Sequence, residues 1–304
     1  MRIPVITALL LFTAVALAGS LPFAHYGVLD TPSASLLRHS EIGFGMAGSV
    51  YSVDDSSGSS NMDVSVAGYL ELGLFGRGQI GGSFLGSGGF SGTARGLIFA
   101  ETITRPGFVA GVENITGEKN YDFFRDDNDS LYTYPVSQNL SIYGVFTKDF
   151  TYLISFPVKI SIGYGTGRFQ QSDESQDGFD NPIPGLFGSI HFTPLPETVF
   201  ELEWDGRDIN AGGRYRLNRN FTITAAASEI EYLFGSDSTS DGDVMQTPKF
   251  TVGIQGAFGP ILGRTELDPY EKLRYTDDDE ALRQLEEYRA GAREEIRELE
   301  DSIR

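Results

Sequence analysis

The sequence contains no cysteine, three histidines and few basic residues, with 23 Lys and Arg against 42 Asp and Glu. Without cysteine, the chain can form no disulfide, no thiolate metal site and no cysteine nucleophile. Three histidines (His25, His39 and His191) provide little for a zinc site or a catalytic triad. The formal net charge of -19 argues against a nucleic-acid-binding surface, which needs clustered Lys and Arg. We therefore expect no metal, no cofactor and no nucleic-acid partner.

The N-terminus carries a short apolar run. Arg2 precedes an apolar stretch from Ile3 to about Leu17, and Ala16-Leu17-Ala18 stands before Gly19. This pattern is typical of a secretory signal peptide cleaved near Ala18. The alternative is a membrane anchor, but the run is short for a bilayer span of about 20 residues. We expect residues 1–18 to be a signal peptide and the mature chain to leave a bacterial cytoplasm.

Glycine and aromatic residues are abundant, at 37 residues and 12%, which is typical of a protein with many strands. From Ser40 to Gly259 the apolar residues recur with period two. In "MDVSVAGYLELGLFG", for example, Val64, Leu70 and Leu72 share one face, and Asp63 and Glu71 lie on the other. Each such strand is half buried, so its apolar face meets either a protein core or lipid.

The lengths of the connections separate these two cases. The pattern predicts about twelve strands, near residues 40–52, 61–75, 78–87, 90–103, 107–116, 138–148, 156–168, 185–193, 198–206, 209–217, 220–231 and 249–259. Every long connection follows an odd-numbered strand, and most of the others are short, such as "FGRG" and "PLPE". This asymmetry is typical of a transmembrane β-barrel, whereas a β-sandwich has no reason to segregate its loops. We expect an all-β, antiparallel transmembrane barrel over residues 40–259, preceded by a periplasmic segment at 19–39.

Aromatic residues near strand ends suggest the interfacial girdle of such a barrel. The candidates are Tyr51, Phe75, Phe90, Phe146, Phe169 and Phe258. Tyr164 is expected near the outer girdle, with Arg168 on the same side in reach of lipid phosphate.

The faces expected to line the lumen carry charged residues. They are Asp63, Glu71, Arg95, Glu101, Glu113, Lys159, Glu201, Glu203, Asp205, Arg214 and Arg216. One interpretation is a selective channel or a glycan passage, because charged rings set selectivity. The other is that acids and arginines pair across the lumen and close it. The acids at 201, 203 and 205 facing the arginines at 214 and 216 suggest a cross-strand ion-pair ladder.

Three glycines end the predicted strand "KISIGYGTGRF". A phosphate-binding loop would need a helix directly behind it, but an acidic loop follows instead. Gly163, Gly165 and Gly167 are therefore expected to form a bare strip facing the lumen. Such a strip leaves room for strong curvature or for something packed inside the barrel.

Ser189 and His191 face inward on one predicted strand, which raises the possibility of an outer-membrane hydrolase. A nucleophile needs a base in reach, a third group to orient that base and an oxyanion hole. No motif for an oxyanion hole accompanies the pair, so we expect no enzyme activity.

The composition changes after Gly259. Residues 260–304 are rich in Glu and Arg, and they contain one apolar stripe at helical spacing: Leu285, Tyr288, Ala292, Ile296, Leu299 and Ile303. An even number of strands returns the chain to the periplasm, so we expect a charged periplasmic α-helix there. Because an isolated helix of this size is marginal in water, we expect it to bind a periplasmic protein or to self-associate.

Several segments, taken in order, resemble the YjbH-type outer-membrane barrels associated with bacterial exopolysaccharide and capsule export. They are "GVLDTPSASLLRHSEIGFG", "PGFVAGVENITG", "LSIYGVFTKDF", "KISIGYGTGRF" and "ELEWDGRDINAGGRYRLNRNFTITAA". The second resembles that family's Gly-hydrophobic-x-Asp/Asn-Ile-x-Gly turn, and the third its Tyr-x-Val-x-Ser-Lys strand, with Thr147 in place of the serine. The resemblance spans residues 27–227.

The resemblance implies a non-enzymatic component, a passage or a scaffold, of exopolysaccharide or other envelope-polymer export. The charged lumen equally suits a small porin-like solute channel, and the Ser-His pair leaves the hydrolase as a further alternative. The expected partners are outer-membrane lipid or lipopolysaccharide, a polysaccharide and the partner of the C-terminal helix. The expected location is the bacterial outer membrane.

Overall fold

The computed structural model describes residues 25–54, 60–84, 90–102, 105–116, 140–151, 156–170, 183–206, 208–233 and 248–261. In the unit Gly263–Arg304 it describes the single residues Arg289, Arg293, Arg297 and Asp301. Only the backbone is described for residues 52–54, 60, 61, 63 and 232. The predicted signal peptide and the apolar stripe of the C-terminal helix lie outside these residues, so both stay predictions.

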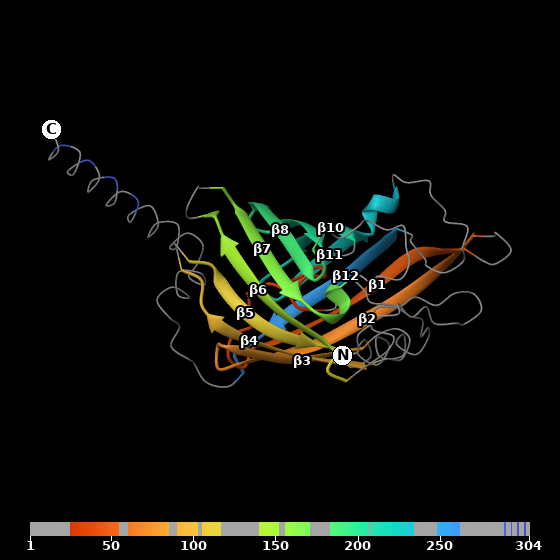
Figure 1. Cartoon of the computed structure of the whole chain (residues 1–304), viewed down its shortest axis with the longest axis horizontal. Helices are drawn as coiled ribbons and strands as arrows, with labels where there is room; N and C mark the ends of the chain where they lie inside the picture. Colours follow the sequence, from red (N-terminus) through yellow and green to blue (C-terminus); the bar gives the residue numbers. More distant parts are fainter. Residues whose placement is uncertain are drawn as a thin grey trace, which may run out of the picture. The chain divides into compact units, whose positions relative to one another are not determined.

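Twelve antiparallel strands close into one barrel (Figure 1). They are β1 (Ile42–Asp54), β2 (Ser60–Leu74), β3 (Gly78–Phe84), β4 (Phe90–Phe99), β5 (Gly107–Glu113), β6 (Ser141–Asp149), β7 (Val158–Gly165), β8 (Leu186–Leu195), β9 (Thr198–Trp204), β10 (Ile209–Arg216), β11 (Phe221–Ser228) and β12 (Lys249–Phe258). Each strand pairs with its neighbours in sequence, and β12 pairs with β1. Two short 3-10 helices follow β7 and β11: η2 (Gly167–Phe169) and η3 (Ile230–Leu233).

The predicted barrel of about twelve strands is thus confirmed. Most observed strand boundaries lie within three residues of the predicted ones. The connections also segregate as expected: those spanning 114–140, 166–185 and 229–248 all follow odd-numbered strands, whereas 75–77, 196–197 and 217–220 follow even-numbered ones. β-branched residues suit these strands because their side chains pack well on a pleated surface.

The barrel is apolar outside and polar inside. Among the most exposed side chains of the strands are Leu70, Phe90, Ile162 and Val252, whereas Ser65, Glu71, Thr147, Glu203 and Gln255 are buried. This is the reverse of the burial in a water-soluble domain. It is the arrangement of a barrel surrounded by lipid, in which the outward faces meet hydrocarbon. Among the described residues, no helix is long and apolar enough to cross a membrane.

Outward aromatic rings gather at the end of the barrel that carries the short turns. Phe44, Phe221 and Phe258 contact one another there, as do Phe99, Phe108 and Phe146. Of the six aromatics expected in a girdle, Phe75, Phe90, Phe146 and Phe258 are exposed.

The other two expected girdle residues, Tyr51 and Phe169, are buried. Tyr51 shares the inward parity of Ser49, because side chains two apart on a strand point to the same face. Phe169 lies in η2, beyond the end of β7, so the parity of that strand does not place it.

The largest departure from expectation concerns residues 25–39, the described part of the segment expected in the periplasm. We call residues 25–39 the inner segment. It enters the barrel and contacts inward-facing side chains of strands all around the wall before it leads into β1 at Ile42. The apolar residues of the inner segment recur at neither helical nor alternating spacing. Their pattern therefore could not predict that the segment lies inside the barrel.

Candidate functional site in the barrel interior

Side chains of the wall hold the backbone of the inner segment. Six backbone N–H groups of residues 26–37 donate to side-chain oxygens on five strands, at 2.7 to 3.2 Å. The pairs are Tyr26 to Glu71, Gly27 to Gln255, Asp30 and Thr31 to Glu203, Ala34 to Thr147, and Leu37 to Gln79. A buried backbone N–H without a partner is costly, so these acceptors determine where the segment can lie.

Apolar side chains of the inner segment fit against places where the wall has little side chain. Leu29 and Leu37 are buried. A Cβ added to Gly212 would lie 3.3 Å from Leu29, and one added to Gly43 would lie 2.9 Å from Leu37 and 3.0 Å from the ring of Tyr26. The glycines of β1 and β10 therefore provide the space that the segment occupies.

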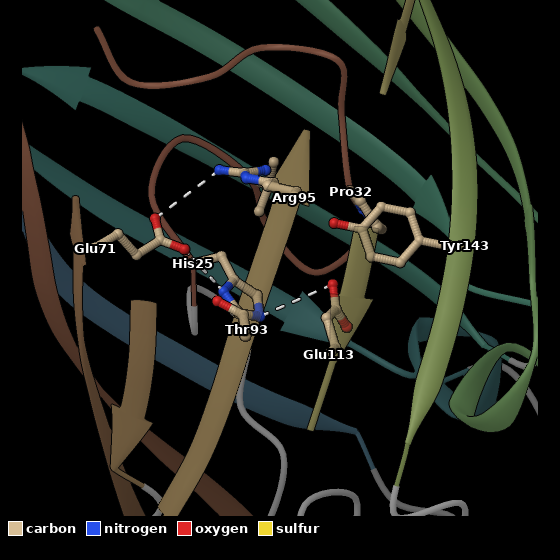
Figure 2. A pocket seen from close by; sticks show the side chains of 8 residues that line it. His25, Pro32, Glu71, Thr93, Arg95, Glu113 and Tyr143 are labelled. Carbon is tan, nitrogen blue, oxygen red and sulfur yellow. Dashed lines mark hydrogen bonds and ion pairs between the residues drawn. The ribbon is translucent and has the colours of Figure 1, made fainter. Parts of the chain in front are cut away.

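The first cluster of charged groups centres on His25, at the start of the inner segment (Figure 2). Its Nδ1 lies 3.1 Å from Glu71 Oε1 in β2, and its Nε2 lies 4.0 Å from Glu113 Oε1 in β5. Glu71 also accepts hydrogen bonds from Gln79 and from the backbone of Tyr26, and Arg95 of β4 lies 3.9 Å from it. We call His25, Glu71, Arg95 and Glu113 the His25 cluster.

A small cavity borders the His25 cluster, between Val28 and Pro32 of the inner segment and Thr93 and Tyr143 of the wall (Figure 2). It offers about 10 Å³ to the centre of a water molecule, the space of about one water. A bound solute or glycan needs much more volume than this. With the inner segment in place, this cavity is therefore no passage.

Arg168 also departs from the sequence-based expectation. It was expected to face lipid, but its side chain is buried in the interior. Its guanidinium donates to Glu113 Oε2 at 2.7 Å, to Asp30 Oδ2 at 2.8 Å and to the Asp30 carbonyl at 3.0 Å. The reason is local: β7 ends at Gly165, and Gly167 has a φ of +68°, a conformation that glycine adopts easily. The turn that follows directs Arg168 inward.

Asp30 is thus held from two sides. Glu203 accepts its backbone N–H at 2.8 Å, and Arg168 donates to its carboxylate and to its carbonyl. Charge-assisted hydrogen bonds of this kind are about twice as strong as neutral ones. Asp30 is therefore the main attachment point between the inner segment and the wall.

The second cluster of charged groups lies on the wall itself. His191 of β8 has Nδ1 3.4 Å from Glu201 Oε1 and Nε2 3.9 Å from Glu203 Oε1, both on β9. Arg214 of β10 forms an ion pair with Glu201, and Lys159 of β7 lies directly across from His191 in the ladder. We call His191, Glu201, Glu203 and Arg214 the His191 cluster.

The ion-pair ladder expected between β9 and β10 is reduced to one pair. Arg214 reaches Glu201 diagonally, because its direct partner in the register is Val199. Glu203 holds the inner segment instead, and Asp205 accepts hydrogen bonds from Asn210 and from the backbone of Asp208. The side chain of Arg216 is exposed at the end of β10 and donates to the carbonyl of Pro196, so it does not line the lumen. The ladder fails because the register places Arg214 opposite Val199, two residues away from Glu201.

Two other predicted lumen residues, Glu101 and Asp63, lie outside both histidine clusters. Glu101 lies in the connection after β4, where it accepts hydrogen bonds from Lys148 and from the backbone of Asp149. It therefore belongs to the end of the barrel. Asp63 pairs with Tyr51 in the backbone ladder, but its side chain is outside the described residues.

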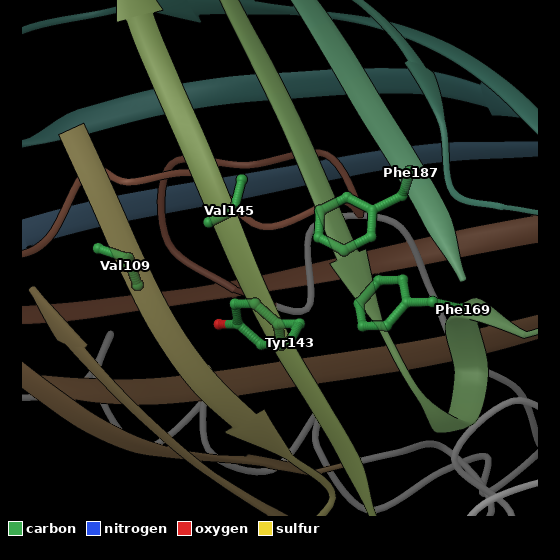
Figure 3. Packing of buried hydrophobic residues seen from close by; sticks show 5 residues of the cluster. All are labelled: Val109, Tyr143, Val145, Phe169 and Phe187. Carbon is green, nitrogen blue, oxygen red and sulfur yellow. The ribbon is translucent and has the colours of Figure 1, made fainter. Parts of the chain in front are cut away.

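Aromatic rings cover Gly163 and Gly165 of the glycine strip, and Figure 3 shows these rings, Phe187 and Phe169, with Tyr143 beside them. A Cβ at Gly163 would lie 2.1 Å from the ring of Phe187, directly across on β8, and one at Gly165 would lie 2.5 Å from Phe169. Phe169 and Phe187 stack at 4.4 Å, and Tyr143, Val109 and Val145 complete a buried cluster. Ala34 and Leu36 of the inner segment pack against it. The bare strip thus makes room for packing inside the barrel, whereas Gly167 serves the turn.

The Ser-His pair does not have the geometry of a catalytic pair. Ser189 Oγ has no hydrogen-bond partner among the described residues, and its direct partner across the ladder is Glu203. Within the same part of the chain, no group of three or more His, Cys, Asp or Glu side chains could hold a metal ion.

Sequence reasoning missed several residues of this interior: His25, Asp30, Gln79, Thr147, Arg168 and Gln255. Gln79, Thr147 and Gln255 have the inward parity of their strands, so parity alone could have identified them. Charge was the signal for the predicted lumen residues, whereas the inner segment needs acceptors for its N–H groups, and amides and hydroxyls provide these equally well.

No family model matches the chain, and no curated protein matches it either. Among solved structures, the Yersinia pestis attachment invasion locus protein Ail is 10% identical, over 72% of this chain and 99% of that one, with a TM-score of 0.22. An outer-membrane channel from Pseudomonas putida F1 is 11% identical, over 75% and 98%, with a TM-score of 0.35. The outer-membrane protease OmpT from Escherichia coli is 10% identical, over 74% and 98%, with a TM-score of 0.22. Likenesses with such TM-scores carry no conclusion about the function of this chain.

Proposed function

We propose that this chain is a β-barrel of the bacterial outer membrane that serves, without enzyme activity, as a passage or scaffold in the export of exopolysaccharide or another envelope polymer. The membrane location is supported by the closed wall with apolar side chains outside and polar ones inside. The aromatic clusters at the end with the short turns support it as well, because such rings favour the interface between lipid and water.

The observation that carries the proposal is the occupied interior. The charged and amide side chains of the wall bind residues 25–39 of the same chain through six backbone hydrogen bonds and the ion pair between Asp30 and Arg168. An open solute channel would keep these groups in water. A barrel that is closed at rest suits a scaffold or a passage that opens for its polymer.

The link to polymer export depends on the resemblance to the YjbH-type barrels. One of the segments that carry it, "GVLDTPSAS" at residues 27–35, belongs to the inner segment. The Ser-His hydrolase is the less favoured alternative, because the Ser189 hydroxyl makes no hydrogen bond to His191 among the described residues.

Two measurements test the proposal in order. Purified protein extracted from membranes should migrate differently in electrophoresis before and after heating, as a closed barrel does when it unfolds. In planar lipid bilayers the same protein should show no steady conductance at rest. A steady open pore would favour the porin-like solute channel instead.

The export role needs a test in cells. Deletion of the gene should lower the amount of extracellular polysaccharide, and the full chain supplied from a plasmid should restore it. An unchanged amount of polysaccharide in the deletion strain would contradict the export role. It would not bear on the proposal that the barrel is closed at rest.

A further inference from the structure

We propose that the barrel interior is a binding site for an extended polypeptide, that residues 25–39 occupy it as a removable ligand, and that their departure opens the passage. The inference rests on the proposed function in one respect, that a passage exists to be opened. The binding site itself rests on the contacts of the inner segment alone.

The strand pairing that closes the wall does not involve the inner segment. All twelve strands pair in an unbroken circle, from β1 through β2 to β12 and back to β1. No described residue from 25 to 37 takes part in that ladder. Since its closure uses no hydrogen bond of the segment, the barrel can lose the segment without breaking a strand pair.

The wall binds the inner segment mainly through the segment's backbone. Five wall side chains, Glu71, Gln79, Thr147, Glu203 and Gln255, accept hydrogen bonds from backbone N–H groups of the segment. Hydrogen bonds to the main chain of a bound peptide give affinity that does not depend on its side chains, and here the acceptors are side chains of the wall. The side chains Leu29, Ala34 and Leu37 fill small recesses at Gly212, Gly107 and Gly43, which adds specificity.

The attachment at the middle of the segment can be weakened without breaking the wall. Ser40, just after it, is tied to the wall by a backbone bond to the Gly73 carbonyl at 2.8 Å. In the middle, Asp30 is attached by the ion pair with Arg168 and by Glu203. Loss of the Asp30 carboxylate would leave Arg168 paired with Glu113, so the wall would stay intact while the segment is loosened.

The absence of cysteine allows a direct test of departure. A Cβ at Gly107 lies 3.5 Å from the Cβ of Ala34, a separation that a disulfide can span. The double variant Ala34→Cys/Gly107→Cys should therefore lock the segment to β5 when oxidised, with a shift of a few tenths of an ångström at Glu101. The control is Met46→Cys/Gly68→Cys, in which the Cβ atoms lie 3.9 Å apart across β1 and β2 and the segment is untouched.

The loosened barrel is the full chain with Asp30→Ala, and the matched control is Ser35→Ala in the same segment. In planar bilayers we expect Asp30→Ala to raise the fraction of time in a conducting state at least about tenfold, whereas Ser35→Ala has little effect. Oxidised Ala34→Cys/Gly107→Cys combined with Asp30→Ala should abolish the conductance, and a reducing agent should restore it. The oxidised β1–β2 control should leave it unchanged.

Two further measurements distinguish a segment that does not leave the interior from a passage that does not open. A synthetic peptide of residues 25–39 should close the Asp30→Ala barrel, whereas a scrambled peptide should not. A small charged thiol reagent should label the single variant Ala34→Cys at least about tenfold faster when Asp30→Ala is also present. Heat-modifiable migration must show that each variant is a folded barrel.

Each combination of results has one meaning. Faster labelling with silent bilayers would retain the removable segment and contradict the passage. Conductance that the oxidised lock does not abolish, or that the peptide does not close, would overturn the inference and leave the passage in place. Folded Asp30→Ala protein with neither conductance nor faster labelling would overturn the inference as well.

Discussion

The two histidine clusters of the interior contain the same types of group but are assembled differently. Each combines one histidine, two glutamates and an arginine. In the His25 cluster the histidine comes from the inner segment, and Glu71 receives hydrogen bonds from three partners at 3.1 Å or less. In the His191 cluster the histidine belongs to the wall, and the buried atoms His191 Nε2, Glu201 Oε2, Glu203 Oε1 and Arg214 Nε have no hydrogen-bond partner among the described residues.

The difference shows what the inner segment contributes. A buried polar group without a partner costs about 1–3 kcal/mol, so a wall lined with carboxylates is unfavourable until something supplies donors. Where the segment places His25 and the backbone N–H of Tyr26, the carboxylate of Glu71 has hydrogen-bond partners. Where it supplies only backbone N–H groups, to one oxygen of Glu203, the four atoms named above have no hydrogen-bond partner among the described residues. The following substitutions test this contrast, from the largest effect to the smallest.

The largest effect is expected from Glu71→Ala. It removes the acceptor of His25, Gln79 and the Tyr26 backbone and leaves Arg95 buried without that partner. Breaking a buried charge pair from one side costs about 3–5 kcal/mol. Urea unfolding of the protein in phospholipid vesicles measures this loss, with the exposed Glu197→Ala as control, expected within about 0.5 kcal/mol. Equal stability of the two variants would contradict the role of Glu71.

The second effect separates the charge of Glu203 from its role as an acceptor. Glu203→Ala leaves the backbone N–H groups of Asp30 and Thr31 buried without an acceptor, so the expected loss is about 2–3 kcal/mol. Glu203→Gln keeps an oxygen there and should lose about 1 kcal/mol or less. The same unfolding experiment compares them. If both variants lose the same free energy, the charge and not the hydrogen bonding matters at this position.

The third effect compares the histidines directly. His25→Leu removes the contact with Glu71 and should lower the free energy of unfolding by about 1.5–2 kcal/mol, because hydrogen bonds to charged groups are stronger than neutral ones. His191→Leu removes a ring whose Nε2 already lacks a partner, so about 1 kcal/mol or less is expected. A larger loss for His191→Leu would reverse the ranking of the two clusters.

The smallest effect is expected at the end of β10. Arg216→Ala removes an exposed side chain that donates a hydrogen bond to the Pro196 carbonyl, so the change should stay within about 0.5 kcal/mol. Arg214→Ala leaves Glu201 without its closest cation and should cost at least about 2 kcal/mol. Similar losses for the two arginines would restore the ladder that the sequence predicts.

Much of the wall could be predicted from the sequence, because its signals are local. Period-two alternation fixes which side chains share a face, and glycine-rich or polar connections mark where strands end. That is why twelve strands, their order and the inward direction of Glu71, Glu113, Glu201 and Glu203 follow from the residues alone. The alternation along β1 also predicts that Tyr51 points inward, as observed. Its position near a strand end suggests a place in the aromatic girdle instead.

The tertiary structure decided what fills the barrel. The inner segment has no period, and its partners Glu71, Thr147, Glu203 and Gln255 lie 45 to 228 positions away in the chain. Arg168 turns inward because Gly167 takes a positive φ just after β7 ends. Such contacts depend on where distant strands meet, since a closed wall brings side chains of many strands around one space. The sequence alone therefore determined a charged, glycine-lined interior, and only the fold determined that the chain's own residues 25–39 occupy it.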